Sequence, residues 1–312
     1  MQGTEAGQST VPSRLAWLAD ALDRFLLLLV LASATLGIAL PAPGRHLDAG
    51  NAILATLAVL VLCTGASMTF SDIAAIRAAS RRMVIVLTVT TVTLPALAWL
   101  ASQLVSSHAL RGGVLAAGVA PAEVASVALT GLAGSETALA GGLLVASTVL
   151  TVLLAGPILS LLGANSTTSQ SGLLVTLALV VALPLLAGAT MRTIDPFSGR
   201  EQSLLRVLGT VSLLVLLWEV ASELQLRASD ARVAAALLLY LAGGAGLGWL
   251  LAIGAPARQR TAIFLPTAMR DFAVAAGIAA SAFGAPAAAP LGIYGIFVLV
   301  FGTVAVYIIR RH

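Results

Sequence analysis

Long apolar stretches alternate with short polar segments along almost the whole chain. Each of ten such stretches holds about 17–25 predominantly apolar residues, the length that an α-helix needs to cross a bilayer. They lie at about 22–41, 51–70, 83–104, 112–133, 137–161, 172–191, 203–223, 232–253, 261–283 and 286–309. No segment between them is long enough for a soluble domain. The pattern therefore predicts an all-α integral membrane protein with ten transmembrane helices.

The first stretch follows Asp20, Asp23 and Arg24, so its flank lacks the positive excess of a secretory signal peptide. We expect it to remain as a membrane helix behind a cytoplasmic N-terminal tail, residues 1–21, of which residues 1–13 are polar and disordered. The composition suits lipid: 59% of the residues are hydrophobic and 10% charged, with a mean hydropathy of +1.02. Soluble domains are about one quarter charged.

All 17 basic residues are arginine, and they stand singly or in pairs at the ends of apolar stretches. This distribution is typical of membrane flanks and excludes a nucleic-acid-binding face, although the pI is about 10.2. Most arginines fall on the side that holds both termini and the even-numbered loops. The positive-inside rule then predicts a multi-pass protein of the inner (plasma) membrane with both termini in the cytoplasm. The segment 71–82 is expected to form a short amphipathic helix on that face.

An internal repeat is indicated by shifting the chain by 145 residues. The shift places Pro121 on Pro266 and stretches three, four and five on stretches eight, nine and ten. Because five helices per half is an odd number, the two halves must be inverted relative to each other. We expect a first five-helix repeat over 22–163 and a second, inverted one over 172–312.

Stretches four and nine each carry a proline and charged residues near mid-membrane, in 118–123 (GVAPAE) and 265–271 (LPTAMRD). Proline removes a backbone donor and clashes with the preceding turn, which predicts helix breaks at Pro121 and Pro266. Broken backbone at membrane depth is tolerated only against protein or a water-filled cavity. Two crossed discontinuous helices are therefore a natural substrate or ion site.

Three ionisable residues lie at these breaks: Glu123, Arg270 and Asp271. Each costs about 2.5–3.5 kcal/mol near the centre of a membrane helix on insertion scales, so their presence needs a reason. In one interpretation Arg270 faces an anionic substrate or replaces a bound cation, and a carboxylate takes up a proton. In the other, an arginine–carboxylate bridge fastens the crossed helices. Adjacent residues on an intact helix point about 100° apart, so Arg270 and Asp271 serve one cavity only if the helix is unwound.

No enzymatic or metal-binding constellation is present. His46, His108 and His312 fall in loops or the C-terminal tail, Cys63 is the single cysteine, and no HExxH, GxSxG or P-loop pattern occurs. We expect no enzyme and no cofactor other than sodium or a proton as coupling ion. Glu219 and Glu223 are expected at the solvated outer end of the seventh helix.

The chain resembles the bile acid:sodium symporter family and its bacterial relatives over most of its length. The segments that carry the resemblance are 67–70 (SMTF), 121–126 (PAEVAS), 132–134 (LAG), 145–148 (VAST) and the stretch 261–279. The resemblance implies ten helices in two inverted repeats, with discontinuous helices four and nine crossed. It also implies a core domain of helices 3–5 and 8–10, a panel domain of helices 1, 2, 6 and 7, and sodium-coupled uptake of organic anions.

The sodium ligands implied by the resemblance are largely replaced. Val127 stands where an asparagine is usual, Ala140 and Leu144 stand where hydroxyl residues are usual, and Thr90 replaces a glutamine. In helix nine, Pro266, Arg270 and Asp271 match the usual glutamate, glutamine and asparagine, so Ser126 alone remains. A guanidinium among sodium ligands would repel the ion.

We therefore expect a secondary transporter of a small carboxylate that keeps the fold but has lost two-sodium coupling, with Arg270 as a tethered cation. Guanidinium also binds carboxylates in a bidentate fork. The candidate substrate ligands are Arg270, Asp271, Glu123, Ser126 and Thr267. The candidate ion-coupling residues are Glu123, Asp271, Ser126 and Thr90.

Two alternatives remain from the sequence. One is a proton-linked exporter of the auxin-efflux or arsenite-efflux type, although no cysteine lies near the break in helix four. The other is a membrane protein that binds a ligand without transporting it. The expected partners are a small organic anion and the lipid bilayer, with no nucleic acid and no obligatory protein partner.

Overall fold

The computed structural model describes residues 14–42, 52–67, 81–164, 168–194, 197, 199–223 and 228–311. These residues are helical almost throughout and carry one isolated β-bridge. The helices are α1 (Arg14–Arg24), α2 (Leu26–Ala39), α4 (Ala52–Ser67), α6 (Arg81–Ser102), α7 (His108–Val119), α8 (Val124–Leu132), α9 (Thr137–Leu161), α10 (Gln170–Leu177), α11 (Leu183–Ile194), α12 (Gly199–Ser222), α13 (Ala228–Ala252), α14 (Ala257–Ala268), α15 (Phe272–Phe283) and α16 (Ala289–Ile309). A π-helical turn, Ala178–Ala182, joins α10 to α11, and a 3₁₀ turn, Ala285–Ala288, precedes α16.

Six helical segments of the described chain are long and apolar enough to cross a membrane: Arg81–Ser102, Thr137–Leu161, Gln170–Ile194, Gly199–Ser222, Ala231–Ala252 and Ala285–Ile309. Each overlaps one of the ten stretches predicted from the sequence. The other four predicted stretches correspond to shorter or interrupted helices. They are α2, α4, the pair α7 and α8, and the pair α14 and α15. The chain is thus an all-helical integral membrane protein.

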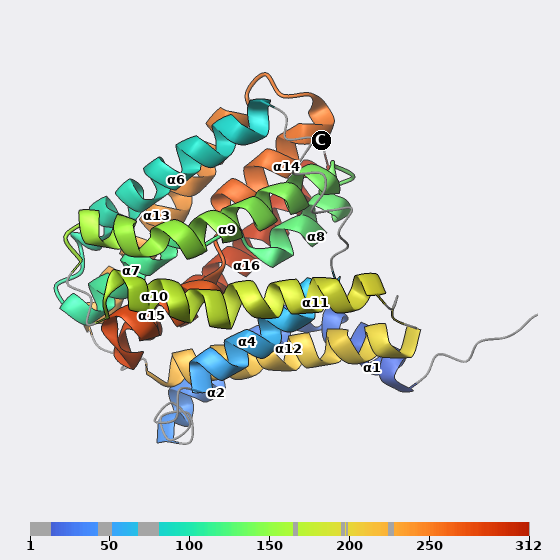
Figure 1. Cartoon of the computed structure of the whole chain (residues 1–312), viewed down its shortest axis with the longest axis horizontal. Helices are drawn as coiled ribbons and strands as arrows, with labels where there is room; N and C mark the ends of the chain where they lie inside the picture. Colours follow the sequence, from blue (N-terminus) through green and yellow to red (C-terminus); the bar gives the residue numbers. More distant parts are fainter. Residues whose placement is uncertain are drawn as a thin grey trace, which may run out of the picture.

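Two groups of helices pack side by side (Figure 1). In the first group, α4 packs against α11 and α12, and α12 packs against α1 and α2. In the second group, the interrupted helices pack among α6, α9, α13 and α16. The groups meet where α10 contacts α9, α4 contacts α15, and α12 contacts α16.

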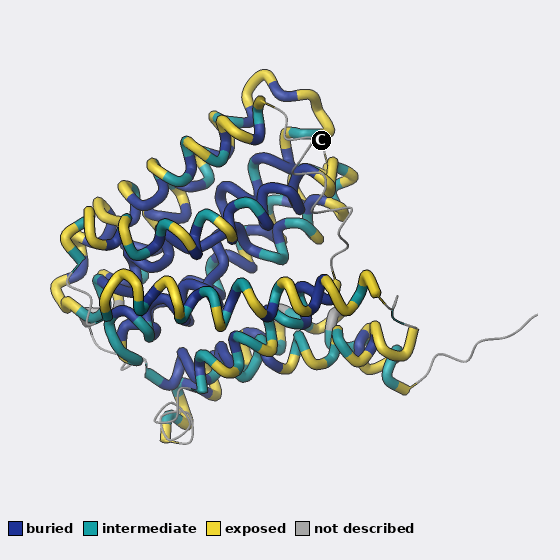
Figure 2. Tube along the Cα trace, in the orientation of Figure 1, coloured by how far each residue is buried: buried dark blue, intermediate teal, exposed yellow. Residues whose placement is uncertain are grey.

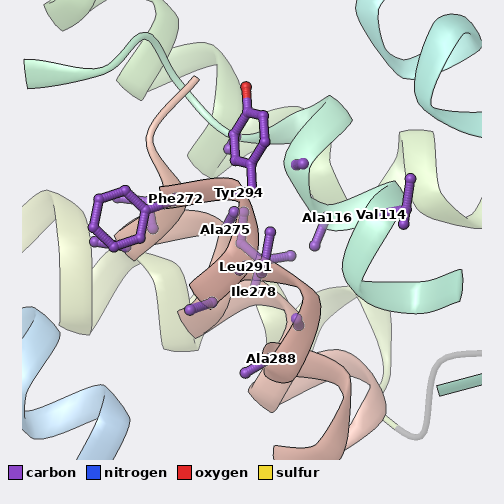
Figure 3. Close-up of a cluster of buried hydrophobic side chains, with 14 of the residues drawn as sticks. Val114, Ala116, Phe272, Ala275, Ile278, Ala288, Leu291 and Tyr294 are labelled. Atoms are coloured by element: carbon purple, nitrogen blue, oxygen red, sulfur yellow. The ribbon is translucent and has the colours of Figure 1, made fainter. Parts of the chain in front are cut away.

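Burial is concentrated in the second group, where the interrupted helices lie (Figure 2). Small side chains let α7, α15 and α16 approach closely, and Figure 3 shows Ala116, Ala275 and Ala288 in this cluster beside Phe272 and Tyr294. All five side chains are 0% exposed. In lipid, close van der Waals packing of small residues is a main source of helix association. The interrupted helices are therefore held in a buried cluster of small and aromatic side chains.

In the first group, α4 and α11 approach through glycine. A Cβ atom added at Gly65 would lie 2.2 Å from the carbonyl oxygen of Leu185, and one at Gly188 would lie 2.3 Å from that of Leu62. Both distances are too short for any side chain, so this contact requires glycine on each helix. The π-helical turn precedes Pro184 on α11 and accommodates the missing backbone donor of that proline.

Two predictions from the sequence are corrected by the structure, and others concern segments outside the described residues. Residues 14–21 were predicted to be tail, but they belong to α1, which packs against α12. Glu219 was predicted to be solvated, but it is 2% exposed and accepts a hydrogen bond of 3.4 Å from Thr56 of α4. The predicted tail 1–13 and most of the predicted amphipathic segment 71–82, namely 71–80, lie outside the described residues.

Candidate transport site at the helix crossover

Two helices are interrupted at the same place in the molecule and are joined there by backbone hydrogen bonds. Between α7 and α8, the Glu123 amide donates to the carbonyl of Met269 at 2.9 Å. Between α14 and α15, the Asp271 amide donates to the carbonyl of Pro121 at 2.9 Å. The two linkers therefore form a short antiparallel bridge that places Ala122 opposite Arg270. This bridge satisfies four of the backbone groups that the helix breaks leave free.

The amides of the two central bridge residues point outward and bond to side chains of neighbouring helices. The Ala122 amide donates to Ser147 Oγ of α9 at 3.0 Å, and the Arg270 amide donates to Tyr294 Oη of α16 at 3.3 Å. Buried amides without partners are costly, so these two side chains stabilise the crossover. The bridge is thus bonded to α9 through the Ser147 hydroxyl and to α16 through the Tyr294 hydroxyl.

Extended backbone decides where the charged side chains lie. Successive side chains on extended backbone point to opposite faces. Glu123 and Asp271 accordingly line a cavity of about 490 Å³, whereas Arg270 lines a separate cavity of about 20 Å³. From the sequence, we expected Arg270 and Asp271 to share a cavity only if the helix is unwound between them. The helix is unwound, but the extended conformation separates the two side chains.

Arg270 is 7% exposed, and its guanidinium lies at the C-terminal end of α7. Its Nε donates to the carbonyl of Ala120 at 2.9 Å, and Nη2 donates to the same oxygen. No ion pair between Arg270 and Glu123 or Asp271 is present, so the predicted arginine–carboxylate bridge is replaced by a bridge to backbone. A cation is favourable at a helix C-terminus, where carbonyls are unpaired and the dipole is negative.

Hydroxyl groups complete the surroundings of Arg270. Thr90, Ser147 and Thr151 line the same small cavity, and Thr151 Oγ1 donates to the carbonyl of Val119 at 2.9 Å. A cavity of about 20 Å³ holds about one water molecule. It has no room for an organic substrate. Arg270 therefore does not line the large cavity, although the sequence placed it among the candidate substrate ligands.

The two carboxylates cap the second halves of the interrupted helices. Asp271 Oδ1 accepts the Val274 amide at 2.9 Å at the start of α15, and Glu123 Oε1 accepts the Ala125 amide at 3.5 Å at the start of α8. Each carboxylate is 6% exposed and lies at the positive end of a helix dipole. Glu123 Oε2 is buried and has no hydrogen-bond partner among the described residues.

The large cavity runs between the two groups of helices. Its floor is formed by Glu123, Asp271 and Phe272, all buried, and Thr148 of α9 also lines it. Toward the end of the molecule where α11 ends and α12 begins, the lining includes Arg192 and the exposed Gln202. The cavity therefore opens at the end with the exposed Gln202 and reaches inward to the buried crossover.

Three further predicted residues, Ser126, Thr90 and Thr267, do not line the large cavity. Ser126 is fully buried and its hydroxyl donates to the Glu123 carbonyl at 2.5 Å, while Thr90 donates to Leu87 at 3.1 Å. The Thr267 hydroxyl is buried without a partner in the described structure. Pro121 lies in the first linker, but Pro266 lies inside α14. The second break therefore falls at Met269–Asp271, later than the predicted position, and this position is a correction.

Several residues that build the site carried little or no sequence signal. Tyr294 and Tyr240 are buried hydroxyl residues in apolar helices, and Tyr240 Oη donates to the carbonyl of Ala117 near the end of α7 at 3.0 Å. Arg192 stood among the flanking arginines that set the orientation. Which of these polar groups turns inward depends on helix rotation, which the sequence of an almost wholly apolar helix leaves undetermined.

Crossed, interrupted helices with charged residues at the break are typical of secondary transporters. The model of the Sodium Bile acid symporter family matches residues 54–230, which is more than half of the chain. The chain belongs to this family, whose members are membrane transporters and not enzymes. This confirms the resemblance seen in the sequence. A comparison with curated proteins finds no match.

Proposed function

We propose that the protein is a secondary active transporter of an organic anion, built from two inverted five-helix repeats. The correspondence of the two breaks supports this architecture, because each is followed by a helix that begins with a capping carboxylate, Glu123 or Asp271. The following helices, α9 and α16, each supply one hydroxyl group to the bridge, from Ser147 and Tyr294. The first group of helices would be the panel domain and the second group the core domain.

The observation that carries the proposal is that the Arg270 guanidinium and the carboxylates of Glu123 and Asp271 line different cavities at the crossover. In transporters with discontinuous helices, carbonyls at half-helix C-termini coordinate the coupling cation. Here the Arg270 guanidinium occupies such a C-terminus by bonding to Ala120. The chain thus supplies a permanent cation where a relative would bind sodium. A sodium ion beside it would be repelled by about 4 kcal/mol at 4 Å for an effective dielectric constant of about 20.

Proton coupling is the proposed energy source. Glu123 and Asp271 face the large cavity from opposite linkers, and Glu123 Oε2 has no donor among the described residues. A carboxylate in that position can take up a proton from the cavity and release it when the cavity faces the other side. This observation also keeps the proton-linked exporter as the second candidate, because the direction of transport is set by the gradients.

The excess of arginine on the side of both termini supports a cytoplasmic location for the end where α11 meets α12. The large cavity opens at that end, so the conformation described here is proposed to face the cytoplasm. Alternating access would then close this cavity and expose the crossover to the opposite side of the membrane.

Flux into proteoliposomes tests the proposal. Uptake of naphthalene-2-sulfonate, an anion at all accessible pH values, is measured under an imposed pH gradient or an imposed sodium gradient of equal size, with protein-free liposomes as control. We expect the pH gradient to drive uptake and the sodium gradient to have no effect. Sodium-driven uptake would contradict proton coupling, and binding without flux under either gradient would favour the non-transporting alternative.

A further inference from the structure

The large cavity has an acidic floor, which bears on where an anion can bind. Glu123 and Asp271 line the floor, while Arg270 faces away from it. An anionic group within about 4 Å of one ionised carboxylate would be repelled by about 4 kcal/mol at an effective dielectric constant of about 20. The N-termini of α8 and α15, which could otherwise receive an anion, are already capped by these side chains. While these carboxylates are ionised, an anionic ligand is therefore more stable with its charge elsewhere.

A cation stands at the other end of the same cavity. Arg192 lies in the last turn of α11 and lines the cavity. Its Nε is buried and has no hydrogen-bond partner among the described residues. A second arginine in the lining, Arg206 of α12, forms an ion pair with Asp20 of α1 at 3.2 Å. Arg192 is thus a guanidinium without a protein carboxylate in the described structure.

The walls between the two ends are apolar. On α11 and the preceding π-helical turn, the lining residues are Val181, Leu185 and Arg192, which share one helix face. Eleven residues at 1.5 Å per residue place Arg192 about 16 Å along the helix from Val181. Leu57 and Leu60 of the neighbouring helix α4 also line the cavity. A volume of about 490 Å³ lies within the range of pockets that enclose whole organic ligands.

We propose that Arg192 holds the anionic group of the substrate, so that the rest of the substrate extends along the apolar walls toward the crossover. This inference rests on the proposed function and names the residue of this chain that binds the anion. A planar guanidinium can bind a carboxylate or a sulfonate through two parallel hydrogen bonds. The position of Arg192 keeps that charge away from Glu123 and Asp271, while the walls between them bury the rest of the substrate.

The single cysteine of the chain supplies a local reporter. Cys63 lies on α4, lines the cavity and is 7% exposed. A ligand in the cavity should slow the alkylation of Cys63 by N-ethylmaleimide, followed by intact-protein mass spectrometry in nanodiscs. The probes are 2-naphthoate, naphthalene-2-sulfonate and the uncharged 2-naphthamide. Binding of radiolabelled 2-naphthoate, corrected with protein-free nanodiscs, is measured in parallel, so the result does not depend on the reactivity of Cys63.

We expect both anions to protect Cys63 in the unmodified protein. Arg192→Gln should raise the anion concentration for half protection at least tenfold, and Arg192→Lys should raise it less. Arg200→Gln is the matched control, because Arg200 is an exposed arginine at the same end of the molecule and does not line the cavity. It should leave both anions unaffected. Protection by 2-naphthamide should be weak and equal in all variants.

Equal effects of Arg192→Gln and Arg200→Gln would overturn the assignment of Arg192. Failure of both anions to bind the unmodified protein in either assay would likewise overturn the proposed anion site at Arg192. Arg192-dependent binding without flux in proteoliposomes would leave this inference standing and refute the transport function, so the two failures are distinguishable.

Discussion

Ser147→Ala tests whether the crossover depends on the side chains that bond to its outward amides. Ser147 Oγ accepts the Ala122 amide at 3.0 Å, and Ala122 is 1% exposed. Removal of the hydroxyl leaves a buried N–H without its protein partner. Such a loss costs about 1–3 kcal/mol. The lost donation from Ser147 to the Leu144 carbonyl adds little, because that carbonyl lies within helix α9.

The expected change is measurable by thermal unfolding in a single detergent. With about 2–4 °C per kcal/mol for larger chains, the midpoint should fall by roughly 2–12 °C. Ser160→Ala is the control, because Ser160 lies exposed on the same helix and the gain in helix propensity is the same. The difference between the variants therefore isolates the bond to Ala122. If both variants unfold at the same temperature, Ser147 does not support the crossover in the way its geometry indicates.

Three further predictions follow from the packing, the caps and the carboxylates at the crossover. Gly248→Ala should destabilise the protein, because the new Cβ would lie 2.8 Å from the carbonyl oxygen of Phe264. Gly246→Ala on the same helix is the control and should be neutral or slightly stabilising, because its Cβ would meet nothing within 4 Å. Equal thermal midpoints for the two variants would contradict the close approach of α13 and α14. Asp271→Asn should keep the cap on the Val274 amide and unfold near the unmodified protein, whereas Asp271→Ala should lose about 0.5–2 kcal/mol. Glu123→Gln should abolish uptake driven by a pH gradient, because Glu123 Oε2 is the carboxylate oxygen without a donor among the described residues. Retained proton-driven uptake would exclude Glu123 as the coupling group.

The sequence was sufficient to predict an all-helical membrane protein, because apolar stretches of membrane length are a strong signal. It also located the crossover, since charged residues beside prolines are rare at membrane depth. It misplaced the second break by relying on Pro266, which α14 accommodates within its helix. The break at Arg270 is stabilised by long-range bonds to Ala120 and Tyr294, and such contacts leave no local pattern.

The roles of the site residues were harder to predict than their positions. The sequence grouped Arg270 with Glu123 and Asp271 because they are close in the chain or in its repeat. An extended linker sends neighbouring side chains to opposite faces, so the structure separates the cation from the two carboxylates. Arg192 was counted only as a flanking charge, because its place on a cavity wall depends on how α11 packs against α4 and α12.

The central claim is that Arg270 replaces a bound sodium ion at the C-terminal end of α7. Thermal unfolding of the purified protein is measured in a sodium titration at fixed ionic strength, with potassium as the balancing cation, because a ligand that binds only the folded state raises its stability. We predict equal midpoints in sodium and potassium for the unmodified protein. For Arg270→Gln we predict a lower midpoint that sodium raises more than potassium does. A selective rise with sodium in the unmodified protein would contradict the claim and restore sodium symport as the mechanism.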